Sequence, residues 1–262
     1  MTVYKDLLDK MTWSYSRLTA YEHCPYHWYL RYIEGQEGEG SFYAENGKIM
    51  HGILHELIKG TLSIYDAPTE YLERFNEIEN TTKQSIMDKT YDSCVNYLDN
   101  LDENILDGYH VVGSEIKINF KVYGYNFVGF IDLLLQDEND NLIVVDHKSS
   151  DPYLKKNGEP YASTKEQFEN YKRQLGLYCY GLAQVFDGRP TKIVFNHFKS
   201  GKMTIVPVSE RLIEDSVNWC LGVIEKIYKD DTFEPLTKTG FCYRLCDYRG
   251  DCDYLKEDEY DE

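Results

Sequence analysis

The sequence lacks the features of several common protein classes. Its 262 residues contain no apolar run long enough to span a bilayer and no G-x-x-x-x-G-K-[ST] motif, so neither a transmembrane helix nor a P-loop motor is expected. The start, MTVYKDLLDKMTW, has no basic stretch followed by an apolar one, which is the pattern of a secretory signal. We therefore expect a cytoplasmic protein whose seven cysteines are thiols or metal ligands rather than disulfides.

Positive charge is also scarce. Lys and Arg number 28 against 45 Asp and Glu, a net charge of −17, which opposes a protein that coats nucleic acid through bulk charge. The acidity is local, because residues 66–107 carry eleven acids and three bases, and residues 251–262 carry seven acids and one base. Residues 148–202, by contrast, hold ten bases and five acids. With 42% hydrophobic and 15% aromatic residues, global disorder is excluded.

Helical periodicity dominates the first part of the chain. A helix begins at Ser14 or Ser16, either of which can cap it, and a second helix is predicted from about Glu45 to Lys59. Residues from about 68 to 107 are predicted to be helical, acidic and solvent-facing.

The pattern then changes to the two-residue alternation of strands. It predicts a three-stranded meander between residues 116 and 145, in which Asp137–Asn141 forms a turn. A long helix from about Thr164 to Phe186 follows. Two further strands and a last helix are predicted over residues 192–198, 203–208 and 210–228. This order predicts a layered, mixed α/β domain.

Two carboxylates and a lysine lie in the predicted meander. Asp132 lies in an apolar strand and Asp146 ends the next one, so hairpin pairing is expected to bring both to one edge of the sheet. A carboxylate in an apolar strand is costly unless it is paired or binds a cation, and oxygen ligands of this kind suit Mg²⁺ or Mn²⁺. Lys148 points to the same side as Asp146 and can orient a water or offset charge on a phosphate. The alternative is an Asp146–Lys148 ion pair with Asp132 as a satisfied buried acid.

Four short motifs occur in order around these residues: G-x-x-x-H at Gly47–His51, G-x-x-D at Gly129–Asp132, D-x-K at Asp146–Lys148 and Q-x-x-x-Y at Gln174–Tyr178. In this order they resemble the RecB-type nucleases of the PD-(D/E)xK superfamily. The S-x-S-x-L…C-P pattern from Ser14 to Pro25 is similar to the opening of that group. The resemblance covers residues from about 13 to 254, apart from the region near 66–107.

The resemblance implies a fold: a restriction-endonuclease-like α/β core with a mixed central sheet, an N-terminal helical region and a C-terminal Cys-rich iron–sulfur staple. We expect one nuclease domain over residues 1–262. It would comprise a helical region, an α/β core, and a cysteine-rich segment with an acidic tail, at residues 13–108, 109–235 and 236–262.

The resemblance also implies roles for individual residues. It implies a Mg²⁺ or Mn²⁺ site whose ligands are His51, Asp132, Asp146 and the backbone carbonyl of His147. It also implies that Lys148 acts on the nucleophilic water. Gln174 and Tyr178 lie at i and i+4, and the family places that helix face beside the active site and DNA. Lys172 and Arg173 are near enough in sequence to reach phosphate, although a solvated helix face explains them as well.

Other candidate ligands are weaker. Glu115 opens the first strand of the meander and is expected to be a surface residue rather than an additional ligand. His55 shares the His51 face and is expected to be a simple polar neighbour. A zincin motif would need Glu directly after His51, where Gly52 stands.

Three cysteines, Cys242, Cys246 and Cys252, fall within eleven residues, and such clustering in a cytosolic chain indicates metal. Cys24 is the candidate fourth ligand. RecB-type nucleases with an iron–sulfur staple look similar, with one Cys near the N-terminus and three near the C-terminus holding a [4Fe–4S] cluster. The spacing here is C-x₃-C-x₅-C, against the family's C-x₂-C-x₅-C. A Cys₄ zinc site is the alternative. The remaining cysteines are expected to be core residues: Cys94, Cys179 and Cys220.

The function implied by the resemblance is a metal-dependent DNA exonuclease acting on single strands or ends. By layout the chain is similar to CRISPR-associated adaptation nucleases and phage RecB-like exonucleases. Its expected partners are therefore DNA and proteins of CRISPR adaptation or phage recombination and replication. We expect a modest DNA affinity that falls with salt. Two competing hypotheses are a non-catalytic DNA-end-binding or assembly protein of the same fold, and a zinc-stapled nuclease of other specificity.

Overall fold

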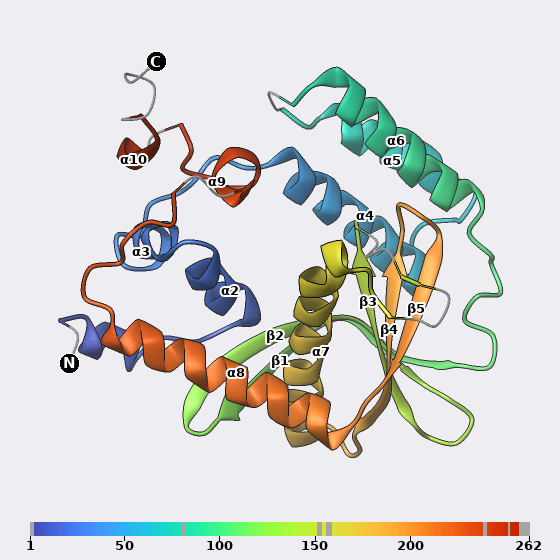
Figure 1. Ribbon diagram of the computed structural model, residues 1–262. Helices are drawn as coiled ribbons and strands as arrows, with labels where there is room; N and C mark the ends of the chain where they lie inside the picture. Colours follow the sequence, from blue (N-terminus) through green and yellow to red (C-terminus); the bar gives the residue numbers. More distant parts are fainter. Residues whose placement is uncertain are drawn as a thin grey trace. The chain divides into compact units, whose positions relative to one another are not determined.

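The computed structural model describes residues 3–79, 82–150, 154–155, 159–237, 240–250 and 252–256 (Figure 1). Asp251 and residues 257–262, which belong to the predicted acidic tail, lie outside the described residues. Within these ranges, no helix is long and apolar enough to cross a membrane.

Along the sequence, helices come before, between and after the strands. Their bounds are α1 Lys5–Leu8, α2 Tyr15–His23, α3 Pro25–Tyr32, α4 Phe42–Lys59, α5 Ala67–Asn76, α6 Gln84–Asp99, the 3₁₀ helix η1 Ala162–Thr164, α7 Lys165–Val185, α8 Glu210–Lys229, α9 Gly240–Arg244 and α10 Asp253–Lys256. The helices predicted near residues 45–59, 164–186 and 210–228 are therefore confirmed as α4, α7 and α8.

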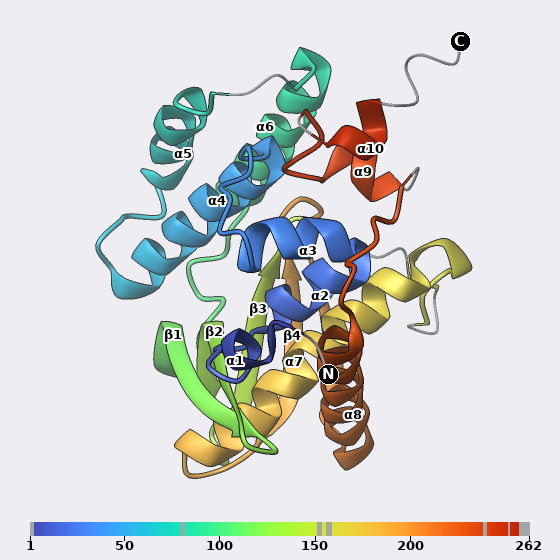
Figure 2. The same cartoon turned by 90° about the vertical axis from the view of Figure 1, so that its left-hand side faces the viewer.

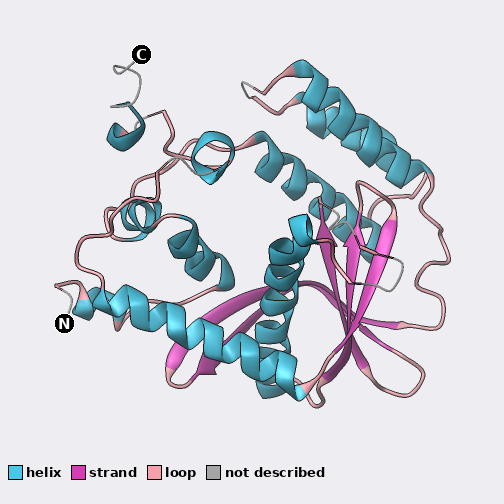
Figure 3. Ribbon diagram, viewed as in Figure 1, coloured by secondary structure: helices cyan, strands magenta, loops and turns pink. Residues whose placement is uncertain are grey.

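The strands form one five-stranded sheet in the order β1-β2-β3-β4-β5 (Figure 3). Their bounds are β1 His110–Val122, β2 Tyr125–Gln136, β3 Leu142–Lys148, β4 Pro190–His197 and β5 Lys202–Pro207. β3 is antiparallel to β2 and parallel to β4, and β5 is antiparallel to β4. A parallel pair needs a crossover connection, which α7 supplies between β3 and β4. The predicted meander and mixed sheet are confirmed.

The residues group into two compact units. The first contains Met1–Ser41, Lys121–Val128 and Val217–Glu262, and the second contains Phe42–Phe120 and Gly129–Ser216. Each unit has its own core.

Aromatic side chains form much of the core of the first unit. Trp28 stacks on Phe233, with ring centroids 5.5 Å apart, and both side chains are buried. Ser14 caps α2 by accepting the backbone N–H of Arg17 at 3.1 Å, as predicted. Pro25 starts α3, a position that needs no backbone N–H, so the Cys-Pro pair separates two helices rather than kinking one.

In the second unit, apolar residues cover both faces of the sheet. Phe195 of β4 packs on one face against Phe168 and Tyr171 of α7, with ring centroids 6.2 and 5.7 Å apart. On the other face, four side chains of β2 and β3 form a cluster that also contacts α4: Leu133, Leu135, Ile143 and Val145. β3 is consequently buried along nearly its whole length.

The segment at 68–107 corrects one expectation. It is helical as predicted, but α5 and α6 are not wholly solvent-facing. Both bury an apolar face against α4, and Figure 2 shows the three helices side by side. The buried residues of the two helices include Tyr71, Phe75, Cys94, Tyr97 and Leu98. Their helical spacing was hidden by the many acidic residues between them.

Close packing of α7 on the start of α8 depends on a glycine. A Cβ at Gly176 would lie 2.2 Å from Ser216 Oγ and 3.0 Å from the Leu212 carbonyl oxygen. We expect Gly176→Ala to lower the free energy of unfolding by about 1–3 kcal/mol because it overpacks this contact. Urea denaturation followed by fluorescence measures the change. The matched control is Gly222→Ala in α8, where no atom lies within 4 Å of the added methyl group. It should stabilise the helix by up to about 1 kcal/mol, and a Gly176→Ala protein as stable as wild type would contradict this description.

Candidate active site

The β2–β3 hairpin places the two acidic strand residues next to each other. Leu133 pairs with Val145, and Asp132 and Asp146 are the next residues on the two strands. Asp132 Oδ2 accepts the backbone N–H of His147 at 2.7 Å, which fixes its carboxylate against β3. The structure therefore brings the two carboxylates to one edge of the sheet, as the hairpin pattern predicts.

Helix α4 brings His51 to the same edge. His51 Nδ1 lies 3.6 Å from Asp132 Oδ1 and 3.7 Å from Glu115 Oε1. One ligand atom from each of His51, Glu115 and Asp132 lies within 4.8 Å of the other two, the arrangement of a metal-binding group. His51 Nε2 is 3.1 Å from the backbone carbonyl oxygen of His147, so this carbonyl also borders the group.

Glu115 lies closer to the candidate site than the sequence indicates. Its side chain is indeed exposed, but it joins His51 and Asp132 rather than standing apart on the surface. Its backbone has φ +52°, a left-handed conformation that is uncommon outside glycine and that tends to persist at functional sites. The only signal in the sequence is that the regular alternation of the strand begins after it, at Ile116.

Charge in this group favours a cation. Burial opposes a charge on His51, but hydrogen bonds to Asp132 and Glu115 and the nearby acids raise its pKa to about 10. Burial likewise opposes ionisation of Asp132, yet the hydrogen bond from His51 and its charge hold the pKa of that carboxyl below its usual value. Burial lowers the pKa of His147 to about 4, so its ring is neutral.

Asp146 and Lys148 form a buried ion pair next to this group. Asp146 Oδ2 lies 2.7 Å from Lys148 Nζ, and Lys148 Nζ donates to Gln174 Oε1 of α7 at 2.8 Å. Burial raises the pKa of Asp146 to about 6 in spite of the lysine. Lys148 also lies over the Tyr171 ring, 4.9 Å from its centroid. The structure thus joins Lys148 to both Asp146 and Gln174, while Asp146 stands beside the trio of His51, Glu115 and Asp132 rather than within it.

Tyr178 packs behind this site. Its ring lies so close to Gly129 that a Cβ at that position would be 2.9 Å from Tyr178 Cε1. Only a glycine at position 129, in the G-x-x-D motif, leaves room for the ring of Tyr178, in the Q-x-x-x-Y motif. Burial raises the pKa of the Tyr178 hydroxyl.

The remaining candidates on helices make local contacts. Lys172 pairs with Glu169 at 2.8 Å, and Arg173 donates to Asn170 at 2.8 Å. Both basic residues lie on α7, the helix that carries Gln174. His55 contacts Ser114 Oγ through Nδ1 at 2.6 Å, as a polar neighbour would.

In the first unit, the four predicted cysteine ligands line one small cavity. Cys24 lies between α2 and α3, and Cys242, Cys246 and Cys252 come from the C-terminal segment. Burial, reinforced by the neighbouring thiols, raises the pKa of Cys246 to about 11. In the described part of the chain, no three of these sulfurs come within 4.8 Å of one another. The other cysteines are fully buried, as expected: Cys94, Cys179 and Cys220.

A comparison with protein families identifies the superfamily of this chain. The family model described as the PD-(D/E)XK nuclease superfamily matches residues 12–253. The chain belongs to this superfamily, which confirms the resemblance at the level of the superfamily and its nuclease fold.

Solved structures add a likeness of fold. A crystal structure of a candidate exonuclease from Eubacterium rectale has a TM-score of 0.55 at 11% identity, over 97% of this chain and 90% of that chain. The structure of SSO0001 has a TM-score of 0.33 at 14% identity, over 96% of each chain, and this score supports no structural argument. No curated protein matches the chain.

Proposed function

We propose that this protein is a metal-dependent DNA exonuclease that hydrolyses phosphodiester bonds in single strands or at DNA ends. The observation that carries the proposal is the meeting of His51, Glu115 and Asp132 next to the Asp146–Lys148 pair. Membership of the nuclease superfamily supports DNA as the substrate, and the candidate exonuclease of similar fold supports removal of nucleotides from an end.

The donor atoms of the site fit a divalent cation. Two carboxylates and an imidazole within 4.8 Å suit Mn²⁺ or Mg²⁺, and the His147 carbonyl beside them adds a hard oxygen. We assign His51, Glu115, Asp132 and that carbonyl as the residues that would hold the ion, with Asp146 next to them. When bound, such an ion supplies Lewis-acid polarisation of a phosphate and a more acidic water.

Two residues of the chain hold the Lys148 ammonium in position. Asp146 and Gln174 hold the Lys148 ammonium from two sides, so this charge is fixed before a substrate arrives. A fixed donor can orient a water and stabilise negative charge on a phosphate without reorganising during the reaction. Lys172 and Arg173, on the same helix as Gln174, are proposed to contact the phosphates of the strand beyond the cleaved bond.

We propose that the four cysteines hold a [4Fe–4S] cluster. Four thiolates around one cavity suit either an iron–sulfur cluster or zinc. The resemblance of the nuclease motifs to RecB-type nucleases with an iron–sulfur staple favours the cluster over zinc. Cytoplasmic location and partners in CRISPR adaptation or phage recombination remain proposals that rest on the resemblance alone.

Digestion of labelled DNA tests the proposed function. We expect Mn²⁺ or Mg²⁺ to support release of short products from single-stranded DNA labelled at the 5′ or 3′ end, and chelation to abolish it. Comparing the two labels gives the polarity, and comparing a circular single strand separates exonuclease from endonuclease action. Binding of DNA ends without cleavage under all these conditions would favour the non-catalytic alternative.

Replacement of Lys148 tests the role of the positioned ammonium. We expect Lys148→Gln to lower kcat about a hundredfold, because the amide can still bond to Asp146 and Gln174 but brings no charge to the phosphate. Single-turnover cleavage of labelled single-stranded DNA measures the effect, and circular dichroism checks the fold. The matched control is Lys226→Gln, at an exposed position of α8, which should cleave at the wild-type rate. Full activity of the Lys148 variant would remove this residue from the mechanism.

A further inference from the structure

One aromatic ring of α7 lies against the ammonium group of Lys148. Lys148 Nζ is 4.9 Å from the centre of the Tyr171 ring, within the distance at which a ring face attracts a cation. Residues three and four apart are neighbours on a helix, so Tyr171 belongs to a row of side chains along one side of α7: Gln167, Tyr171, Gln174 and Tyr178. This row extends the Q-x-x-x-Y motif towards the start of the helix.

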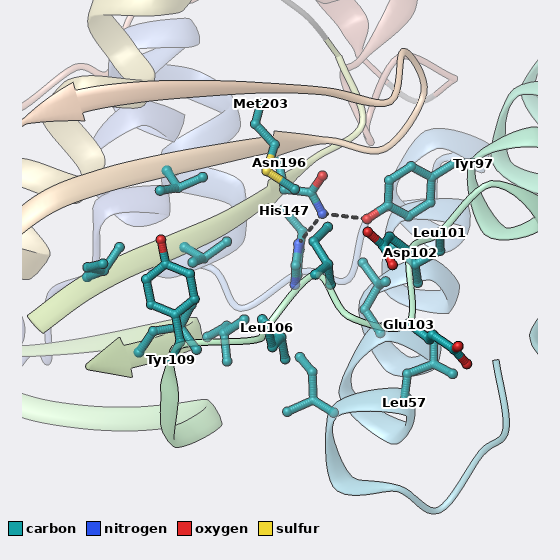
Figure 4. Close-up of a pocket in the computed structure, with 18 of the residues that line it drawn as sticks. Leu57, Tyr97, Leu101, Asp102, Glu103, Leu106, Tyr109, His147, Asn196 and Met203 are labelled. Carbon is teal, nitrogen blue, oxygen red and sulfur yellow. Dashed lines mark hydrogen bonds between the residues drawn. The ribbon is translucent and has the colours of Figure 1, made fainter. Parts of the chain in front are cut away.

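Strand β3 directs Lys148 towards α7. Side chains alternate along a strand, so Asp146 and Lys148 share one face and His147 points to the other. There His147 lines a cavity between α4 and the sheet (Figure 4). On the α7 face, Phe195 is the β4 residue paired with Asp146, and its ring centroid is 5.7 Å from that of Tyr171. The Tyr171 ring therefore packs on the same face of the sheet as the lysine.

The hydroxyl group of Tyr171 is anchored as well. Its oxygen is 2.5 Å from Ser150 Oγ and accepts a hydrogen bond from the Gln167 side-chain amide at 3.0 Å. Gln167 also donates to Ser150 Oγ at 2.8 Å, so the three side chains contact one another. Ser150 follows Lys148 by two residues, and this network joins the end of β3 to α7. Tyr171 cannot turn away from Lys148 without breaking these contacts.

The ammonium keeps a hydrogen-bond donor for another group. Lys148 Nζ donates to Gln174 Oε1 at 2.8 Å and pairs with Asp146 Oδ2 at 2.7 Å. Among the described residues, these are its two polar partners. An ammonium has three N–H donors, so one stays available to a water or a phosphate oxygen. Because the lysine stem is flexible, the direction of that donor depends on what surrounds it.

We propose that Tyr171 is a positioning residue, whose ring face holds the Lys148 ammonium with one N–H directed to the substrate phosphate. This inference rests on the proposed nuclease function. A ring attracts the positive charge through its quadrupole, so it fixes the ammonium without the neutralising charge that a second carboxylate would bring. An aliphatic side chain would fill the same space without attracting the charge. Tyr171 acts on the reaction through Lys148 and touches no substrate itself.

Fluorinated rings test this attraction in the full chain. In the Tyr171→Phe protein, the new ring can be fluorinated in steps, which keeps its shape nearly constant but removes negative charge from its face. We expect Tyr171→Phe to cleave single-stranded DNA within about threefold of the wild-type kcat, because only the hydroxyl contacts are lost. From there kcat should fall about tenfold to the pentafluoro form. KM should stay unchanged throughout the series.

Two controls separate this effect from packing. Tyr171→Leu removes the ring and should lower kcat at least as far as the pentafluoro form does. Tyr65 is 81% exposed, and Tyr65→Phe with a pentafluorinated ring should cleave at the wild-type rate. Circular dichroism checks that each variant is folded. A purely structural ring would give equal rates along the fluorinated series.

Side-chain NMR tests the contact without DNA. With ¹⁵N-labelled lysine, the Lys148 ammonium signal is the one that Lys148→Gln loses. A ring face shifts nearby protons upfield, so this signal should lie further upfield in wild type and Tyr171→Phe than in Tyr171→Leu. The proposal is overturned if the signal is the same in all three proteins, if Tyr171→Phe loses as much activity as Tyr171→Leu, or if kcat stays constant along the fluorinated series. A wild type that cleaves no DNA would refute the proposed function instead, and the NMR comparison would still decide the role of the ring.

Discussion

Replacing Asp132 with asparagine is expected to reduce cleavage of single-stranded DNA by about a thousandfold or more, which corresponds to about 4 kcal/mol of lost transition-state stabilisation. Asp132 is the residue that joins the parts of the site. One of its oxygens faces His51, and the other accepts the backbone N–H of His147. Asparagine keeps the size of the side chain but removes a charge from the cation-binding group.

Metal titration distinguishes this loss from simple unfolding. The Asp132→Asn protein should bind Mn²⁺ more weakly in a calorimetric titration while it unfolds cooperatively. Glu138→Gln is the matched control, because it removes an exposed carboxylate from the turn of the same hairpin and should leave cleavage unchanged. Cleavage by Asp132→Asn at more than a tenth of the wild-type rate would show that the reaction occurs elsewhere.

Replacing Cys246 with serine is expected to unfold or severely destabilise the first unit. Structural metal centres contribute on the order of 10 kcal/mol to folding, which exceeds the whole stability of many domains. Anaerobically purified wild type should be brown with broad visible absorption and should contain iron and sulfide, whereas Cys246→Ser should lose both colour and iron.

The buried cysteines outside the cavity provide the control. Cys220→Ala changes a buried thiol of α8 in the same unit and should retain the iron content of wild type. A colourless wild-type protein with one equivalent of zinc would replace the iron–sulfur assignment with a zinc site. Wild-type stability in Cys246→Ser would contradict a structural role for either metal.

Much of this fold follows from local sequence patterns. The alternation in β1, the apolar runs of β2 and β3, and the apolar periodicity of α4, α7 and α8 are local patterns that predict these elements one by one. The pairing of Asp132 with Asp146 could also be predicted, because a short turn fixes the register of a hairpin. The four cysteines that the sequence groups together line one cavity, and their role as metal ligands stays a prediction.

The parts that escaped prediction depend on distant contacts. Glu115 lies beside His51 and Asp132 and has a left-handed backbone conformation, and the residue type at that position predicts neither. α5 and α6 each bury one face because α4 packs on it, whereas their acidic composition alone suggests that both helices face solvent. A cavity lies where four strands, two helices and the segments after those helices leave space between them, and no local pattern encodes that.

The two units are interleaved along the chain, and this affects the order in which the protein can be completed during synthesis. The chain passes between the units four times, so neither can be cut out as one continuous fragment. All residues of the second unit have been made by Ser216, whereas the first unit waits for the segment that begins at Val217. Cys24 is made early, but its proposed partner thiols all follow Ser216 in the sequence. Loading of the proposed cluster would therefore come only after every residue of the nuclease sheet has been made.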